Sequence, residues 1–177
     1  APDVYAGAPT SVAAFMAVAT KVGAFAALIR VFMETIPPFD IRWNESLSWF
    51  AIFTLIYANF VALKQVQMRR FFAYSGIAQA GIMLIPLIVG TESAKEALLF
   101  YLVIYALATL GCFAVLTALD ERQEGVRLQD LRGLLKRSPL LFTFFSLCLL
   151  TLAGIPPTAG FLAKFLILKE AFESGYY

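Results

Sequence analysis

Histidine is absent from the 177-residue sequence, and cysteine occurs only twice, at Cys112 and Cys148. Without histidine the chain lacks both the side chain that most often titrates near neutral pH and the commonest metal ligand. Each cysteine lies within an apolar run with no second cysteine nearby, so the sequence predicts neither a metal site nor a structural disulfide. A glycine-rich phosphate loop and a CxxC pair are also missing. We therefore expect that this chain itself holds no cofactor and carries out no redox chemistry.

Charged residues are scarce as well, at 15% of the chain, whereas hydrophobic residues make up 60% and the mean hydropathy is +0.78. This composition is far too apolar for a soluble domain of this size and is typical of an integral membrane protein. The formal net charge is only +2, and the basic residues lie mostly in short links between apolar runs. The lipid bilayer is therefore an expected partner, and nucleic acid is not.

Five apolar stretches are long enough to cross a bilayer core, which takes about 20 helical residues. They span residues 11–33, 46–63, 71–89, 94–119 and 140–168. Together they predict an all-α fold, a polytopic membrane helix bundle in which residues 1–177 form a single membrane domain. The last stretch contains Gly154, Pro156, Pro157 and Gly160 near its centre, so we expect a helix that is broken between Gly154 and Pro157.

The longest link, residues 120–138, alternates charges with leucines at helical spacing and is predicted to lie as an amphipathic segment on the membrane surface. Most lysines and arginines fall on the same side as this segment. That side holds Lys64, Arg69, Arg70, Arg122, Arg127, Arg132, Lys136 and Arg137, and the other holds Arg42, Lys95 and Lys169. Because basic links stay on the inner side of a membrane, the N-terminus is predicted to lie on the cytoplasmic or matrix side.

Two lysines lie inside predicted spans, where a lone cation costs several kcal/mol unless it faces water or a partner. Lys21 lies near the middle of the first span, and Lys164 follows the break in the last span. Irregular backbone at membrane depth is tolerated where it lines a watery cavity, so the break favours a hydrated pocket beside Lys164. Such lysines often mark an ion path, and here they are consistent with proton transfer. The alternative is that both lysines and the break serve packing alone.

Hydroxyl and amide side chains lie between these two lysines, in the third and fourth spans. They are Tyr74, Ser75, Gln79, Tyr101, Tyr105 and Thr109. Groups of this kind can order a chain of waters, but membrane helices also use them to hydrogen-bond one another. From the residues alone, both interpretations stay open.

Three segments of the sequence, in the same order, resemble one membrane-protein family. They are PDVYAGAP at residues 2–9, MRRFFAYSGIAQAG at residues 68–81 and LAGIPPTAGFLAKF at residues 152–165. The family is that of the antiporter-like membrane subunits of respiratory complex I, the NADH:quinone oxidoreductase. The first and last segments look most like its subunit N, or subunit 2, branch. The resemblance runs through the whole chain, which covers only part of a family member's length.

The resemblance implies that the chain is part of a proton-translocating subunit that takes no part in the redox chemistry. Lys21 falls on the eighth-helix lysine of the family's proton path. Lys164 falls on the lysine of the broken twelfth helix, which exchanges protons with one side of the membrane. Tyr105 falls in the polar position of the eleventh helix. Gln79 takes a tenth-helix position where many relatives have histidine, so the bridging water chain is expected to be arranged differently here.

The family's proton path also uses helices that precede this segment. The resemblance therefore implies that a second chain supplies them, or that the sequence is a fragment. The other implied partners are the remaining membrane-arm subunits of complex I.

The chain begins at Ala1 without methionine and without a signal peptide, so we expect a processed or cut N-terminus. This favours the mitochondrial inner membrane, with the bacterial plasma membrane as the alternative. Two other functions stay open. One is a subunit of a Mrp-type cation/proton antiporter, and the other is a structural subunit of the membrane arm that transports nothing.

Overall fold

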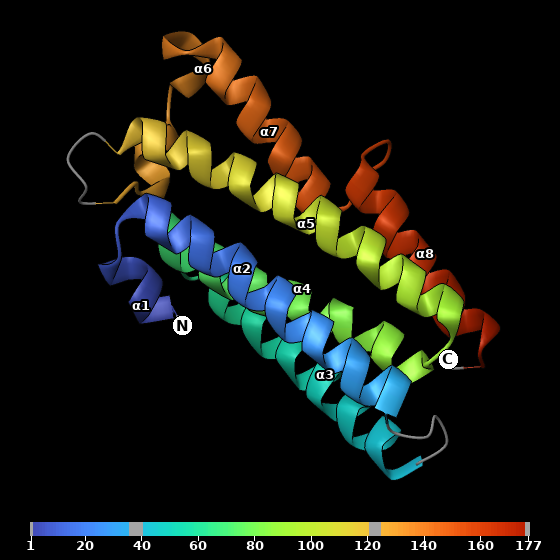
Figure 1. Cartoon of the computed structure of the whole chain (residues 1–177). Coiled ribbons are helices and arrows are strands. Elements are labelled where there is room, and N and C mark those ends of the chain that lie inside the picture. The colour runs from blue at the N-terminus through green and yellow to red at the C-terminus, as the bar shows by residue number, and fades with distance from the viewer. Residues whose placement is uncertain (1, 36–40, 121–124, 176–177) are drawn as a thin grey trace.

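The computed structural model describes residues 2–35, 41–120 and 125–175, and within them the regular structure is helical (Figure 1). The elements are α1 Pro2–Gly7, α2 Thr10–Ile29, the π-helical η1 Arg30–Thr35, α3 Ile41–Ala62, α4 Met68–Val89, α5 Glu92–Leu119, the 3₁₀ turn η2 Leu128–Leu131, α6 Leu134–Arg137, α7 Pro139–Ala153 and α8 Ala159–Glu173. Among the described residues, α2 with η1, α3, α4 and α5 are each long and apolar enough to cross a membrane.

The predicted fold, a polytopic bundle of membrane helices, is confirmed. The helices begin slightly earlier than the apolar runs, because their first turns hold charged residues such as Arg69 and Glu92. The predicted break in the last span is also present. There α7 ends at Ala153, Gly154 takes a left-handed conformation with φ of +79°, and α8 starts at Ala159. Only glycine adopts this conformation without steric cost, so it stops α7 at this point.

Helix α5 lies at the centre of the bundle and contacts α2, α4, α7 and α8 (Figure 1). Helices α7 and α8 follow one another along α5, and α3 packs mainly against α4. Large apolar side chains that are completely buried fill the core around α5. They include Met83, Leu98, Phe113, Leu116 and Ile167. In a bilayer such contacts stabilise the bundle by close packing rather than by excluding water.

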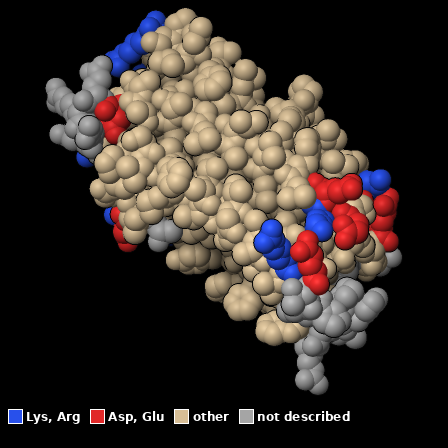
Figure 2. All heavy atoms as spheres, in the orientation of Figure 1, with Lys and Arg blue, Asp and Glu red and all other residues tan. Residues whose placement is uncertain are grey.

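Charged side chains gather at the two ends of the molecule, and the visible face between them is uncharged (Figure 2). Because successive long helices alternate in direction, the basic links named from the sequence share one end. Arg122 and the side chain of Arg42 lie outside the described residues. Which end faces the cytoplasm or matrix stays a prediction.

At the end of the bundle that holds the basic links, contacts between segments that are distant in sequence stabilise the fold. The N–H of Met68 donates to the carbonyl of Val126 at 2.9 Å, which joins α4 to the connector after α5. The hydroxyl of Thr10, at the start of α2, donates to the carboxylate of Asp120 at 2.6 Å. The starts of α2 and α4 are therefore fixed beside the end of α5.

In its described part, residues 125–138, the connector is not one continuous helix. Gly133 takes a left-handed conformation with φ of +77° between η2 and α6, so the helical spacing of the leucines is interrupted there. As a result Leu134 is buried, whereas Leu128 and Leu135 are exposed. Residues 121–124 of this predicted segment lie outside the described residues.

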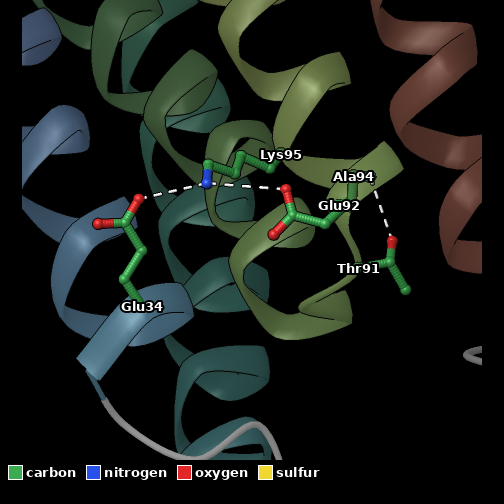
Figure 3. Close-up of polar contacts among 5 residues, drawn as sticks. All are labelled: Glu34, Thr91, Glu92, Ala94 and Lys95. Atoms are coloured by element: carbon green, nitrogen blue, oxygen red, sulfur yellow. Dashed lines mark hydrogen bonds and ion pairs between the residues drawn. The ribbon is translucent and has the colours of Figure 1, made fainter.

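The opposite end carries an ion-pair cluster (Figure 3). The Nζ atom of Lys95 lies 3.2 Å from a carboxylate oxygen of Glu34 and 3.7 Å from one of Glu92. The hydroxyl of Thr91 accepts a hydrogen bond of 3.1 Å from the N–H of Ala94 and so caps the start of α5. The cluster ties the end of η1 to the start of α5.

Candidate functional site

Lys21 lies in the middle of α2 and is half-buried. Its Nζ atom donates a hydrogen bond of 2.8 Å to the hydroxyl of Tyr105 and one of 3.3 Å to the carbonyl of Ala17. The same nitrogen lies 5.2 Å from the centre of the Tyr105 ring. Tyr105 is buried and donates to the Ala17 carbonyl at 3.3 Å. Neutral oxygens and an aromatic ring therefore hold the ammonium group.

Lys164 lies in the second turn of α8, just beyond the break, and is also half-buried. Its Nζ atom donates to the carbonyl of Leu152 at 2.7 Å and to that of Ala153 at 3.2 Å. In a continuous helix these carbonyls would accept from the N–H groups four residues later, at Pro156 and Pro157. Proline has no N–H, so both acceptors are left free at membrane depth. Lys164 binds to both of them.

Gln79, buried in the middle of α4, connects α5 with the same break. Its amide nitrogen donates to the carbonyl of Leu152 at 2.9 Å. Its amide oxygen accepts a hydrogen bond from the hydroxyl of Tyr101, a buried residue of α5. The carbonyl of Leu152 is therefore shared by Gln79 and Lys164.

The polar contacts form two groups that meet at α5. One group joins Lys21 to Tyr105, and the other joins Tyr101 to Lys164 through Gln79. Tyr101 and Tyr105 are one helical turn apart, which places their β-carbons about 6 Å from each other. In the part of the chain that the structure describes, no hydrogen bond joins the two groups. The transfer of a proton between the two groups would require an intervening group such as water.

A pocket of about 400 Å³ opens beside Gln79 and Lys164. Ser75 of α4 and Asn59 of α3 also line it, so polar groups from three helices face the same space. A pocket of this size with several polar groups can hold water. The nearby hydroxyl of Thr109, one turn after Tyr105 on α5, is buried and has no hydrogen-bond partner among the described residues. A buried hydroxyl group without a protein partner can be satisfied by water.

The family described as "NADH:quinone oxidoreductase/Mrp antiporter, TM" matches residues 1–177. The chain belongs to this family. It is 63% identical over 176 residues to NADH-quinone oxidoreductase subunit N of Protochlamydia amoebophila, a match that covers 99% of this chain and 37% of that protein. Subunit N of Chloroflexus aggregans is 46% identical over 176 residues, covering 98% of this chain and 36% of the relative.

Two solved structures are also similar to this chain. A chain of respiratory complex I from Thermus thermophilus with bound aureothin matches with a TM-score of 0.85 and 42% identity, over 98% of this chain and 38% of that one. A chain of the membrane-bound sulfane sulfur reductase, an archaeal respiratory membrane complex, matches with a TM-score of 0.85 and 25% identity, over 97% of this chain and 35% of that one. The present chain thus spans little more than a third of the length of the relatives it matches.

Of the four residues singled out as site candidates, Lys21, Gln79 and Tyr105 lie in the middle of α2, α4 and α5, and Lys164 lies just beyond the break between α7 and α8. The structure brings Lys21 to Tyr105, and it brings Gln79 to the acceptor that Lys164 uses. It does not join Tyr105 to Lys164 directly. The part that these residues play in proton transfer stays a prediction.

Two members of the site were not singled out from the sequence. Tyr101 was one hydroxyl among several, because its contact with Gln79 depends on how α4 and α5 are rotated. The carbonyl of Leu152 was missed because backbone atoms carry no sequence signal of their own. The available signal was Pro156, which lies four residues later and cannot donate to that carbonyl. Within the described residues, no cluster of three His, Cys, Asp or Glu side chains is placed to hold a metal ion.

Proposed function

We propose that this chain is part of a proton-translocating membrane subunit of NADH:quinone oxidoreductase, and that Lys21 and Lys164 carry the protons. Two half-buried lysines lie near mid-depth, and uncharged oxygen atoms hold both of them. This arrangement is the observation that carries the proposal. Ionisable groups at such depth are costly, and they usually mark an ion path.

The uncharged acceptors make reversible protonation easier. If a carboxylate held Lys21 or Lys164, loss of the lysine's proton would leave a buried anion without a partner, which is strongly unfavourable. Here the acceptors are the hydroxyl of Tyr105 and the carbonyls of Leu152 and Ala153. When a proton leaves, these groups stay neutral. Either lysine can therefore give up its proton without creating a buried negative charge.

Water is expected to complete the path between the two lysines. A carbonyl oxygen accepts a hydrogen bond but has no proton to pass on, so the shared carbonyl of Leu152 cannot relay a proton by itself. The pocket beside Gln79 and Lys164 offers room for water at this point. The buried hydroxyl of Thr109 offers a further water partner near Tyr105. We therefore propose a path from Lys21 through Tyr105 and water to Lys164.

The chain acts only as a non-redox subunit in this proposal, and the energy for transport arrives from electron transfer elsewhere in the complex. The proposed partners are the other membrane-arm subunits and the polypeptide that supplies the remaining helices of the family's proton path. The two subunit N relatives and the Thermus structure come from bacteria, which supports the bacterial plasma membrane as the location. The mitochondrial inner membrane stays a prediction without such support.

The test replaces each lysine in the full-length subunit of the assembled complex. Lys21→Ala and Lys164→Ala are compared with Lys64→Ala, which removes a lysine from the exposed link after α3. The purified complexes are reconstituted into liposomes, and NADH-driven proton uptake is measured together with quinone reduction. We expect proton uptake to be lost in the first two variants and retained in the third.

Unchanged proton uptake in both Lys21→Ala and Lys164→Ala would show that the chain has only a structural role. Copurification separates the proposal from a Mrp-type antiporter, because that assembly holds no flavin or iron–sulfur proteins. The 63% identity to a subunit N over nearly the whole chain favours the oxidoreductase.

A further inference from the structure

Gly76 of α4 lies against the contact between Lys21 and Tyr105, and it is buried. If this residue had a β-carbon, the nearest atom would be the Nζ atom of Lys21, closer than two unbonded atoms can approach. The same β-carbon would lie 3.1 Å from the hydroxyl oxygen of Tyr105 and 3.3 Å from Cε of Lys21. The ammonium group therefore occupies the space that a side chain at this position would fill.

We propose that Gly76 is a positioning residue, whose missing side chain allows the ammonium group of Lys21 to reach the hydroxyl of Tyr105. Helix α4 contributes no hydrogen bond to this pair, but its backbone forms the wall that the ammonium group approaches. The consequence for proton transfer rests on the function proposed above. The steric relationship itself does not depend on it.

A β-carbon at Gly76 is expected to change the position of Lys21 rather than the fold. The atom it would meet is the far end of a flexible side chain, which can rotate away. Alanine also has a higher helix propensity than glycine, so α4 is not weakened by the substitution. The ammonium group must then leave the hydroxyl of Tyr105, and the 2.8 Å hydrogen bond is lost.

The chain offers a matched control at Gly23. This glycine lies in α2, near Lys21, and apart from its chain neighbours and the nearby backbone of α2 itself, no atom lies within 4 Å of the place its β-carbon would take. Gly23→Ala therefore makes the same chemical change in the same region without displacing the lysine.

The experiment compares Gly76→Ala, Tyr105→Phe and the double variant with Gly23→Ala in the assembled complex, using proton uptake per electron in liposomes. We expect Gly76→Ala to lower proton uptake by about tenfold, the effect of losing one hydrogen bond to a charged group. In the Tyr105→Phe background the same change is expected to have little further effect, because the contact is already gone. Normal uptake in Gly76→Ala, or fully additive losses in the double variant, would overturn the inference.

Two further measurements separate the possible failures. Lys21→Ala is measured in parallel: if it has no effect, the proposed function fails, and if it abolishes uptake while Gly76→Ala is normal, only the role of Gly76 fails. If Gly76→Ala reduces assembly of the complex, Lys21→Ala is added to it. Recovery of assembly shows that the clash is with the lysine, and no recovery contradicts the proposal.

Discussion

Gln79 and Lys164 donate hydrogen bonds to the same carbonyl oxygen, that of Leu152, at 2.9 Å and 2.7 Å. The amide comes from α4 and the ammonium group from α8, so one backbone atom at the end of α7 joins three helices. If Lys164 swings away, Gln79 still satisfies this carbonyl, which lowers the cost of releasing the lysine. The break can therefore keep its shape while the lysine moves.

Replacement of Gln79 by leucine is expected to damage this junction. Gln79→Leu removes the donor to Leu152 and leaves the buried hydroxyl of Tyr101 without its acceptor, at a cost of about 1–3 kcal/mol in stability. We expect proton uptake in liposomes to fall by about tenfold. The matched control is Gln65→Leu. The amide nitrogen of Gln65, just after α3, donates to the carbonyl of Val61 in the last turn of that helix at 3.1 Å. Equal uptake in the two variants would show that Gln79 serves packing.

Tyr105→Phe tests the hydroxyl that accepts from Lys21. The ring remains, so packing and the aromatic face are kept, whereas the 2.8 Å hydrogen bond is lost. A hydrogen bond to a charged group contributes about 1.5–3 kcal/mol, so we expect proton uptake to fall by at least about tenfold while the complex still assembles. Tyr57→Phe, on the exposed face of α3, provides the control. If both variants pump normally, Lys21 does not need this hydroxyl.

Pro156→Ala tests whether the free carbonyl matters. Alanine restores an N–H group that can donate to the carbonyl of Leu152, in competition with Lys164. We expect a complex of equal or greater thermal stability with reduced proton uptake. The control is Pro86→Ala, which also replaces a proline but lies inside α4 rather than at the break. Full proton uptake in Pro156→Ala would show that Lys164 does not depend on the acceptor that proline leaves free.

Lys95→Ala is expected to leave proton transfer unchanged. Lys95 lies at the end of the bundle, and its partners Glu34 and Glu92 are exposed (Figure 3). Ion pairs on exposed surfaces contribute little, and salt weakens them further. We expect normal proton uptake and at most a small loss of thermal stability that disappears at high salt. A large loss of uptake would place a part of the proton path at this end of the molecule.

Hydropathy alone predicted the fold well. Long apolar runs in a bilayer have few alternatives to helices, because every backbone polar group must be satisfied within the segment. Gly154 and Pro156 also marked the break in the last span correctly. The amphipathic surface connector stays a prediction, although within residues 125–138 Gly133 separates η2 from α6.

The candidate site was predictable only in part. Lys21 and Lys164 could be named because a charge within an apolar run is rare and costly. The contacts around them could not be named, because they depend on the rotation of each helix and on atoms with no side-chain identity. Gly76 is an example, since its importance lies in the atom it lacks and appears only when α2 and α4 are packed together.

The break gives Lys164 a counter-charge that cannot be titrated. The carbonyls of Leu152 and Ala153 lie at the C-terminal end of α7, where the aligned peptide dipoles amount to about half a negative charge. None of the ion pairs between described residues involves Lys164. If this lysine exchanges protons as proposed, the formal charge of the site alternates between zero and plus one. A lysine–carboxylate pair would alternate between minus one and zero. If Lys164 carries protons as proposed, the loaded site repels a second cation, which favours the passage of one proton at a time.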